Sequence, residues 1–379
     1  MATMSYKAAI KPEILRWARE SVRIDIEKAA RTASVKTETY KKWEYGEDFP
    51  TISMLRRLSN LFKRPLPVFF MPKIPEAPPM PEDFRKPMVG LEHPLTKESL
   101  LAIRKARWYQ SVAGDLMTDL GKPVNPVKKY DLKEKPIEKS IKEIRTIDID
   151  IQLSWENNWE ALKNWRQYLE DQGIFVFQFS MPIDEIRGFS LVRENYPPVI
   201  VINSKDSPNG RIFTLFHEYC HVLLNEPGIC VPEEIEFRNE SPNEKEQFCN
   251  EFAGNFLVPS KYLEELIKKF DYPDTIDLIN DFARKFVVSR FVILRRLYSL
   301  RKIDYKSYQK IFSEFQKKVK AFESSGGDFY KNKFTEKGNK FISLVVEAES
   351  GNTITTSKAL EYLGIKLKHY DRIVDMLFQ

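Results

Sequence analysis

The sequence predicts an α+β protein that is mainly helical, with an N-terminal helix-turn-helix bundle, a central domain with a small β-sheet, and a small helical C-terminal unit. Three observations predict this fold class. Apolar residues recur at helical spacing along most of the chain. Three short strand-like runs, GIFVFQF, GFSLVRE and PPVIVINS, lie between residues 173 and 204, each bounded by Gly or Pro. An apolar helix that contains the segment HEYCH follows these runs directly.

Size and composition limit the classes of function. The 379 residues, 42% of them hydrophobic, are enough for two or three domains with their own cores. The net charge of +6 is compatible with nucleic acid, although many solvated surfaces are equally basic. Three cysteines, an odd and small number, argue against a disulfide framework. The N-terminus lacks a signal-peptide core and no apolar run reaches membrane-spanning length, so we expect a cytoplasmic protein without a membrane partner.

Residues 1–72 are expected to form the helix-turn-helix domain. Its first motif helix is predicted at 27–33 and its recognition helix at about 37–44, with Trp43 in the core. Thr51 directly follows a proline and is expected to cap the last helix of the bundle. The residues expected to point outward, toward DNA, are Lys36, Thr37, Thr39, Tyr40 and Lys41.

Two functions stay open for this bundle. Lysines and a helix N-terminus suit contacts with phosphates, and Thr and Tyr side chains can reach base edges. However, no Arg, Gln or Asn occurs between residues 36 and 44, and Glu38, Glu44, Glu47 and Asp48 dilute the basic face. The domain is therefore expected either to bind DNA or to serve as a protein-interaction module.

The remainder of the chain divides into three parts. Residues 73–95 are expected to form a proline-rich linker, because proline stiffens the chain toward extended geometry. Residues 96–320 are expected to form the domain with the sheet, with helices at about 96–120 and 154–172 before the strands. A break at ESSGGDFY precedes a helical C-terminal unit at 325–379.

The segment HEYCH indicates a metal site. Residues four apart on a helix lie about 40° apart around its axis, so His217 and His221 can share one metal ion. Glu218 flanks that position without having to ligate the metal, which suits a base that activates a metal-bound water for attack on a peptide bond. The chain has only four histidines, and these are two of them, which makes a chance match less plausible.

A catalytic zinc ion needs a third protein ligand and an open position. The segment EKEQFCNEFAGNFLVP has a helical period, and Glu246 in it can complete a His-His-Glu site. Glu244 and Glu251 are the alternatives. Asn250 lies one turn after Glu246 and can hold a ligand histidine through its second ring nitrogen.

Two cysteines lie in the same two helices. Cys220 and Cys249 are at positions that favour small residues, where we expect them to pack as small apolar groups. A thiolate metal ligand is the alternative. Because Cys220 adjoins the second histidine, it can also make the site sensitive to oxidation.

Together these stretches resemble the ImmA/IrrE family of metallopeptidases, in the subgroup with an N-terminal helix-turn-helix of Xre type. The matching segments are RIFTLFHEYCHVLLN and EKEQFCNEFAGNFLVP, with KTETYKKWEYGEDFPTISMLRRLSNLFKRPLPVFFMP before them. A C-terminal match begins at GGDFYKNKFTEKGNKFISLVVEA. The sequence departs from the family pattern at Tyr219 and Cys220, where Leu-Gly is usual, and at Cys249, where Ala is usual.

The resemblance implies a zincin-like domain of the gluzincin type with a small sheet. It implies that His217, His221 and Glu246 bind Zn²⁺, or alternatively Mn²⁺, and that Glu218 is the catalytic base. It further implies a protein substrate, a transcriptional repressor with a helix-turn-helix, of phage, mobile-element or stress type.

We therefore expect a zinc endopeptidase that regulates transcription by cleaving a protein partner. The run PPVIVINS is expected to offer a sheet edge to which an extended substrate adds. Two alternatives stay open. One is a DNA-binding regulator with a structural or sensory metal site, and the other is a toxin or antitoxin-type interaction protein.

Overall fold

The computed structural model describes residues 7–75, 95–124, 136–230, 244–270, 276–317 and 328–378. The chain forms two compact units, one of Met1–Arg85 with His93–Ile103 and one of Lys86–Glu92 with Arg104–Gln379. Most of the linker expected at 73–95 lies outside the described residues, and the four-part division of the chain stays a prediction. No helix in the described ranges is long and apolar enough to cross a membrane.

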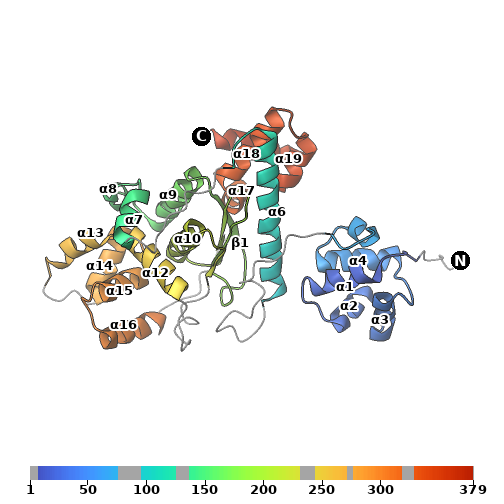
Figure 1. Cartoon of the computed structure of the whole chain (residues 1–379), viewed down its shortest axis with the longest axis horizontal. Helices are drawn as coiled ribbons and strands as arrows, with labels where there is room; N and C mark the ends of the chain where they lie inside the picture. The colour runs from blue at the N-terminus through green and yellow to red at the C-terminus, as the bar shows by residue number, and fades with distance from the viewer. Residues whose placement is uncertain are drawn as a thin grey trace. The chain divides into compact units, whose positions relative to one another are not determined.

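The first unit is a bundle of short helices around one apolar core (Figure 1). Thr51 caps the last α-helix as expected, since its side chain accepts a hydrogen bond from the Met54 N–H. Trp43 and Phe69 are buried in the core. The elements are α1 (Pro12–Glu20), α2 (Ile26–Ala33), α3 (Thr37–Tyr45), α4 (Ile52–Phe62) and the 3-10 helix η1 (Leu66–Phe70).

Two expectations for the recognition helix α3 are wrong. Tyr40 does not point outward: it is fully buried, with its ring centroid 5.7 Å from that of Trp43. Residues three apart share one face of a helix, and this face packs into the bundle. Glu44 does not dilute a basic face either, because it is buried and accepts a hydrogen bond from Arg19 Nε at 2.7 Å. Both residues stabilise the bundle.

The second unit surrounds a small sheet with helices, so the predicted fold class, mainly helical α+β, is confirmed. Helices before the sheet are α6 (Lys97–Asp119, which begins in the first unit), α7 (Ile137–Ile144), α8 (Ile149–Leu153) and α9 (Asn158–Asp171). The strands are β1 (Phe175–Phe179), β2 (Gly188–Leu191), β3 (Val199–Asn203) and β4 (Ile229–Cys230), with α10 (Pro208–Leu223) between β3 and β4. The later elements are α12 (Glu244–Leu257), α13 (Ser260–Ile267), α14 (Ile276–Phe286), α15 (Arg290–Ser299), α16 (Tyr305–Lys317), α17 (Phe329–Lys337), α18 (Asn339–Ser350), α19 (Thr356–Leu363), η2 (Leu367–His369) and α20 (Tyr370–Leu377).

The strand order is β1-β3-β2-β4, with β3 parallel to β1 and antiparallel to β2, and β4 antiparallel to β2. The three predicted strands are confirmed, and the short β4 is an addition to them. The expectation that the β3 run offers an edge to a substrate is wrong, because β3 is paired on both sides. Among the described strands, the edges of this sheet are β1 and β4.

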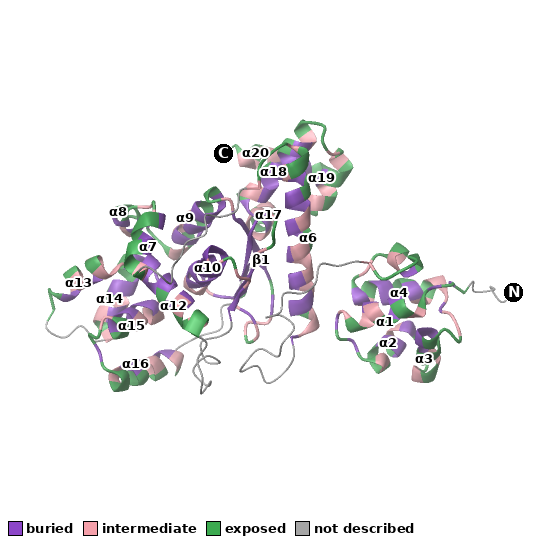
Figure 2. Cartoon of the chain, in the orientation of Figure 1, coloured by how far each residue is buried: buried purple, intermediate pink, exposed green. Residues whose placement is uncertain are grey.

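Helices cover both faces of the sheet (Figure 1). Alternate residues of β1 serve opposite faces. Phe177 stacks on Tyr109 of α6, with ring centroids 5.1 Å apart. Val176 and Ile200 join the core on the side of α10. As a result α10 is buried along almost its whole length, as Figure 2 shows.

A buried ion pair ties the C-terminal helices to the rest of the second unit. Arg166 Nε of α9 lies 3.2 Å from Glu170 Oε1, and the Arg166 guanidinium also donates to the Thr335 carbonyl of α17. Glu170 accepts a hydrogen bond from the Lys340 N–H at 3.0 Å, at the start of α18. Buried charges need partners of this kind, so the pair ties α17 and α18 to the helix that precedes the sheet.

Candidate metal centre

The helix α10 holds the HEYCH segment at a fixed place in the core. Its first turn is capped by Ser207, whose hydroxyl accepts a hydrogen bond from the Gly210 N–H at 3.1 Å. Arg211 then ties the helix to the sheet, since its guanidinium donates to the Asp206 carbonyl at 2.7 Å and to Gln178 of β1 at 3.1 Å. Gly188 of β2 lets α10 lie close, because a Cβ there would lie 2.3 Å from Thr214.

Three of the predicted site residues converge on one point. The Nε2 atoms of His217 and His221 lie 3.3 Å apart, as one turn of helix predicts. Glu246 of α12 reaches both, with Oε2 3.0 Å from His217 Nε2 and Oε1 3.4 Å from His221 Nε2. The alternatives Glu244 and Glu251 are exposed, whereas the Glu246 side chain is only 26% exposed.

The spacing of these three side chains fits a tetrahedral metal ion. Nitrogen and oxygen ligands bind Zn²⁺ at about 2.0–2.1 Å, which separates ligand atoms in a tetrahedron by about 3.3–3.4 Å. The observed separations run from 3.0 to 3.4 Å. Two imidazoles and one carboxylate leave one corner of the tetrahedron open, as a catalytic site requires.

Asn250 holds the first histidine in the orientation that this geometry needs. Its side-chain oxygen Oδ1 lies 3.0 Å from His217 Nδ1, so the ring can donate an Nδ1–H and direct Nε2 toward Glu246 and His221. Asn250 is buried one turn after Glu246 on the same helix. The structure thus brings all five predicted site residues of this region together.

Glu218 is buried beside this cluster with no exposed surface. Neither of its carboxyl oxygens has a hydrogen-bond partner among the described residues. Burial raises the pKa of its carboxyl group. The charges of His221 and His217 act against this rise, but a buried carboxyl group without a hydrogen bond still costs stability, so its presence points to a chemical role.

Glu246 sets the charge of the histidine pair. Burial lowers the pKa of His217 and His221, but their contacts raise it by more: chiefly Glu246 for His217, and Cys249 followed by Glu246 for His221. Burial acts to raise the pKa of Glu246, yet the two histidines hold it well below its usual range. Without metal, the two histidines therefore hold at least one proton between them, and the carboxylate of Glu246 pairs with that positive charge.

The residues that depart from the family pattern are packing residues. Cys220 and Cys249 are fully buried, and the Cys220 thiol together with burial raises the pKa of Cys249. Tyr219 is buried too, with its ring 6.2 Å from that of Phe252 on α12. These side chains fill the contact between α10 and α12.

Two further residues at the site were not expected from the sequence. Gly228 packs flat against His221, because a Cβ on Gly228 would lie 2.4 Å from two atoms of the imidazole ring. The thiol of Cys230 lies within 4.8 Å of a ring nitrogen of His217 and a carboxyl oxygen of Glu218. Cys230 belongs to β4 and Gly228 directly precedes this strand, whose pairing with β2 is non-local and leaves no local pattern in so short a strand.

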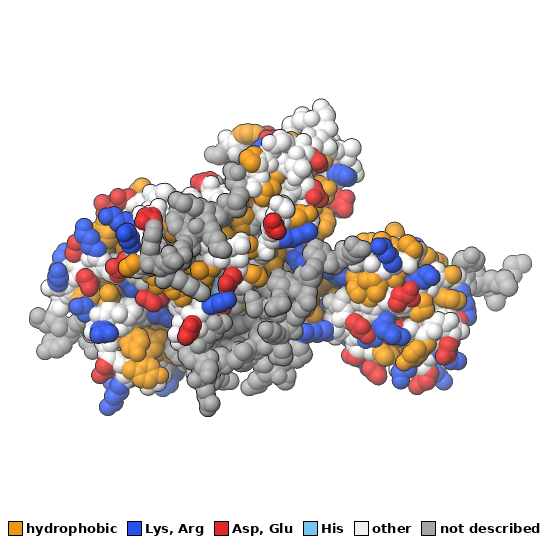
Figure 3. All heavy atoms as spheres, viewed as in Figure 1, with side chains coloured by type: hydrophobic (Ala, Val, Ile, Leu, Met, Phe, Trp, Pro, Cys, Tyr) orange, Lys and Arg blue, Asp and Glu red, His pale blue; other side chains and the backbone are white. Residues whose placement is uncertain are grey.

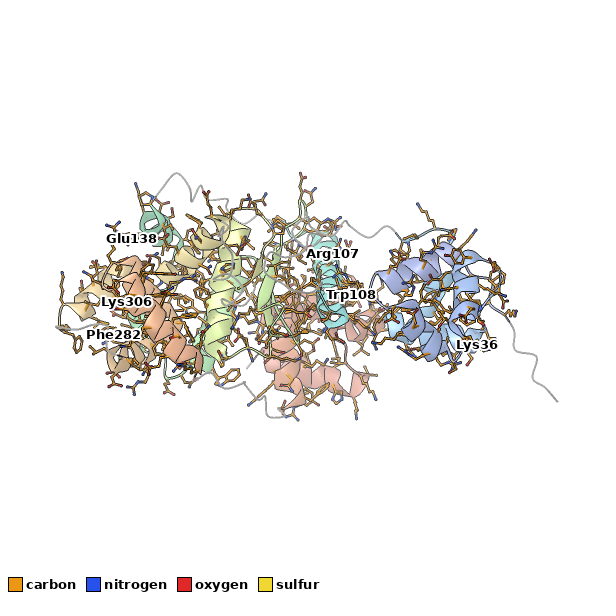
Figure 4. All side chains as sticks on the ribbon, turned by 90° about the horizontal axis from the view of Figure 1, so that it is seen from below. Lys36, Arg107, Trp108, Glu138, Phe282 and Lys306 are labelled. Atoms are coloured by element: carbon orange, nitrogen blue, oxygen red, sulfur yellow. The ribbon has the colours of Figure 1, made fainter. Side chains whose placement is uncertain are left out.

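In the first unit, the residues predicted to face DNA differ in how far their side chains are exposed. Lys36 and Lys41 are exposed, Thr37 and Thr39 are half-buried, and Tyr40 is in the core. Lys36 lies at the surface of the bundle (Figure 4). Lys42 is also exposed on α3 and was not in the predicted set. On the face that Figure 3 presents, basic and acidic side chains are interspersed in both units.

Two segments of the chain match known protein families. Residues 169–298 match a peptidase family described as the IrrE N-terminal-like domain, and residues 15–69 match a helix-turn-helix family. No curated protein matches the chain. The two matches are those of an ImmA/IrrE-type protein with an N-terminal helix-turn-helix domain. The chain therefore combines a segment similar to a metallopeptidase family with a segment similar to a helix-turn-helix family.

Proposed function

We propose that the chain is a zinc endopeptidase that regulates transcription by cleaving a partner protein, a helix-turn-helix repressor. The observation that carries the proposal is the His217, His221 and Glu246 cluster at 3.0–3.4 Å separations beside a buried Glu218 without partners among the described residues. A structural metal site has no use for such a carboxylate. The association of a peptidase domain with a helix-turn-helix supports a substrate in transcription.

Each side chain has a role in this proposal. His217, His221 and Glu246 would hold the metal, and Asn250 would orient His217. A bound Zn²⁺ supplies a Lewis acid that polarises the peptide carbonyl and acidifies a water molecule. Glu218 takes the proton of the attacking water and delivers it to the leaving amine. Its raised pKa suits both transfers, because the carboxyl group must first accept and then give up the proton.

The direct test is cleavage of a candidate substrate. Purified protein with Zn²⁺, and separately with Mn²⁺, is incubated with helix-turn-helix repressors encoded beside the gene for this chain. We expect one repressor to yield two fragments of defined mass, and a chelator to stop the reaction. If the protein binds no metal, or if metal-loaded protein leaves all such repressors whole, the proposed activity is wrong.

Metal affinity is expected to rise with pH. Because the pKa of His217 and His221 is raised in the metal-free cluster, the pair holds at least one proton at neutral pH, which the metal must displace. The apparent Zn²⁺ affinity should therefore increase by about 10-fold per pH unit for one released proton, and about 100-fold for two. Competition with a chelator of known proton affinity, between about pH 6 and pH 8, measures this slope. A flat profile would contradict the protonated cluster.

We also propose that the first unit contacts DNA through the exposed lysines of α3. Replacing both Lys41 and Lys42 with Ala is expected to weaken binding to duplex DNA at all sequences, because lysines contact phosphates. The slope of log affinity against log salt should fall in magnitude by about 1 for each lost contact. Titration of the full chain by fluorescence anisotropy at several salt concentrations measures both effects.

The control for this variant is Lys142→Ala, which removes an exposed lysine from α7 of the second unit. It should leave affinity and slope unchanged. An equal loss in both variants would mean that only net charge matters. No loss in the double variant would favour the protein-interaction role of the bundle.

A further inference from the structure

The edge strand β4 and the residue before it bring two small residues to the helix that carries the HEYCH segment. Gly228 and Cys230 are two residues apart along this extended segment, so they face the same side of the sheet. Gly228 contacts the ring of His221, which identifies this side as the one that meets α10. Two strand residues advance about 6.6 Å, and four helix residues advance about 6.0 Å. Cys230 is therefore opposite His217, as Gly228 is opposite His221.

The distances agree with this register. One ligand atom from each of His217, Glu218 and Cys230 lies within 4.8 Å of the other two, and all three residues are buried. A thiolate and a nitrogen bound to one Zn²⁺ ion lie about 3.5 Å apart. Cys230 does not lie within 4.8 Å of all the ligand atoms of His217, His221 and Glu246, so its thiol has to move toward this cluster to bind the ion. Cys220 and Cys249 join no such group among the described residues. One carboxyl oxygen of Glu218 belongs to this group with His217 and Cys230. Neither carboxyl oxygen of Glu218 has a hydrogen-bond partner among the described residues.

We propose that the Cys230 thiolate is the fourth protein ligand of the metal centre and keeps it closed in a resting state. The inference rests on the proposed metal site of His217, His221 and Glu246. Thiolate is a preferred ligand of zinc and occupies the corner that a catalytic site leaves open. With Cys230 bound, neither water nor a peptide carbonyl reaches that corner. Cleavage then requires that Cys230 leave.

The backbone of the β4 segment determines when the thiol can leave. The Cys230 carbonyl accepts the Arg187 N–H at 2.9 Å, and the Gly228 carbonyl accepts the Ser190 N–H at 2.9 Å. The strand has only two residues and lies at an edge of the sheet. Short edge strands open at lower free energy than internal ones. A polypeptide that displaces β4 would therefore withdraw the thiolate and open the site.

Cobalt replacement tests the inference through a spectrum. The full chain is freed of metal, loaded with one equivalent of Co²⁺ under reducing conditions, and its absorption is recorded. Tetrahedral Co²⁺ absorbs in the visible region whatever its ligands, whereas a bound thiolate adds a charge-transfer band in the near ultraviolet. We expect both features in the wild type. We expect Cys230→Ser to lose the charge-transfer band, keep visible absorption, and bind Zn²⁺ about 10-fold or more weakly.

The matched control is Cys220→Ala, which removes a buried thiol from α10 and should keep both features. Visible absorption in Cys230→Ser also reports that this variant is folded around its metal. Wild-type visible absorption without the charge-transfer band would overturn the role of Cys230 and leave the proposed metal site standing. A charge-transfer band that persists in Cys230→Ser would overturn it too. Failure of the wild type to bind Co²⁺ would overturn the metal site itself.

Discussion

Replacement of Glu218 with Gln is expected to lower the rate of peptide-bond cleavage by about 10²- to 10⁴-fold while leaving metal binding intact. General acid–base catalysis contributes about this much to a rate, and an amide can neither accept the proton of the attacking water nor return it. Gln has nearly the same shape as Glu. Glu218 has no exposed surface, so the replacement fills the same space in the core.

Stability should not fall in this variant. The burial that raises the pKa of Glu218 also means that its negative charge is costly to bury in the folded protein. A neutral amide removes that cost, and the folded state should unfold at the same temperature or higher. Loss of activity in Glu218→Gln can then be assigned to chemistry and not to folding.

Three measurements on the same preparation separate these effects: fragment formation from the repressor, zinc per chain, and the thermal unfolding midpoint. Glu226→Gln is the matched control, because Glu226 just after α10 has a side chain that is 41% exposed and that pairs with Lys245 at 2.7 Å. It should cleave at the wild-type rate. Normal cleavage by Glu218→Gln would remove Glu218 from the mechanism, and loss of zinc would make it a ligand.

Features encoded in contiguous segments were predictable from the sequence. The strands β1 to β3 follow from apolar runs between Gly and Pro, and the facing histidines follow from helical spacing. The sequence predicted Glu246 as the third metal ligand only together with two alternatives, Glu244 and Glu251. Helical period places Glu244, Glu246 and Glu251 around α12, and only tertiary packing decides which one meets α10.

Features that depend on distant pairing could not be predicted. Tyr40 is polar at one end and borders a basic segment, so local chemistry suggested an outward side chain, yet it shares a face with Trp43. Glu44 is buried only because Arg19, 25 residues earlier in the chain, reaches it. Cys230 is the second residue of a two-residue strand that begins directly after Pro227 and Gly228, and its position near His217 arises from pairing with β2.

Replacement of Glu246 with Gln is expected to weaken zinc binding by about 100-fold or more. The carboxylate contacts both histidines, at 3.0 and 3.4 Å, so its loss removes a charged ligand from the site. Changes to residues that merely support a ligand already cost about 10- to 100-fold in metal affinity, and a ligand should cost at least as much. Measurement by chelator competition at one fixed pH gives the ratio of affinities directly.

The same variant should alter the metal-free protein. The negative charge of Glu246 raises the pKa of both buried histidines, and a neutral amide cannot do so. Cys249 and Glu218 still raise the pKa of both histidines, but without the charge of Glu246 this pKa should fall. Histidine NMR signals of the metal-free variant, recorded as a function of pH, should titrate at a lower pH than those of the wild type.

Glu244→Gln is the matched control, since Glu244 lies two residues earlier on α12 and is exposed. It should keep both the zinc affinity and the histidine titration of the wild type. If Glu244→Gln weakened zinc binding and Glu246→Gln did not, the cluster of two histidines and Glu246 would not be the metal site. If Glu246→Gln changed the titration but not the affinity, Glu246 would be a charge partner of the histidines and not a ligand.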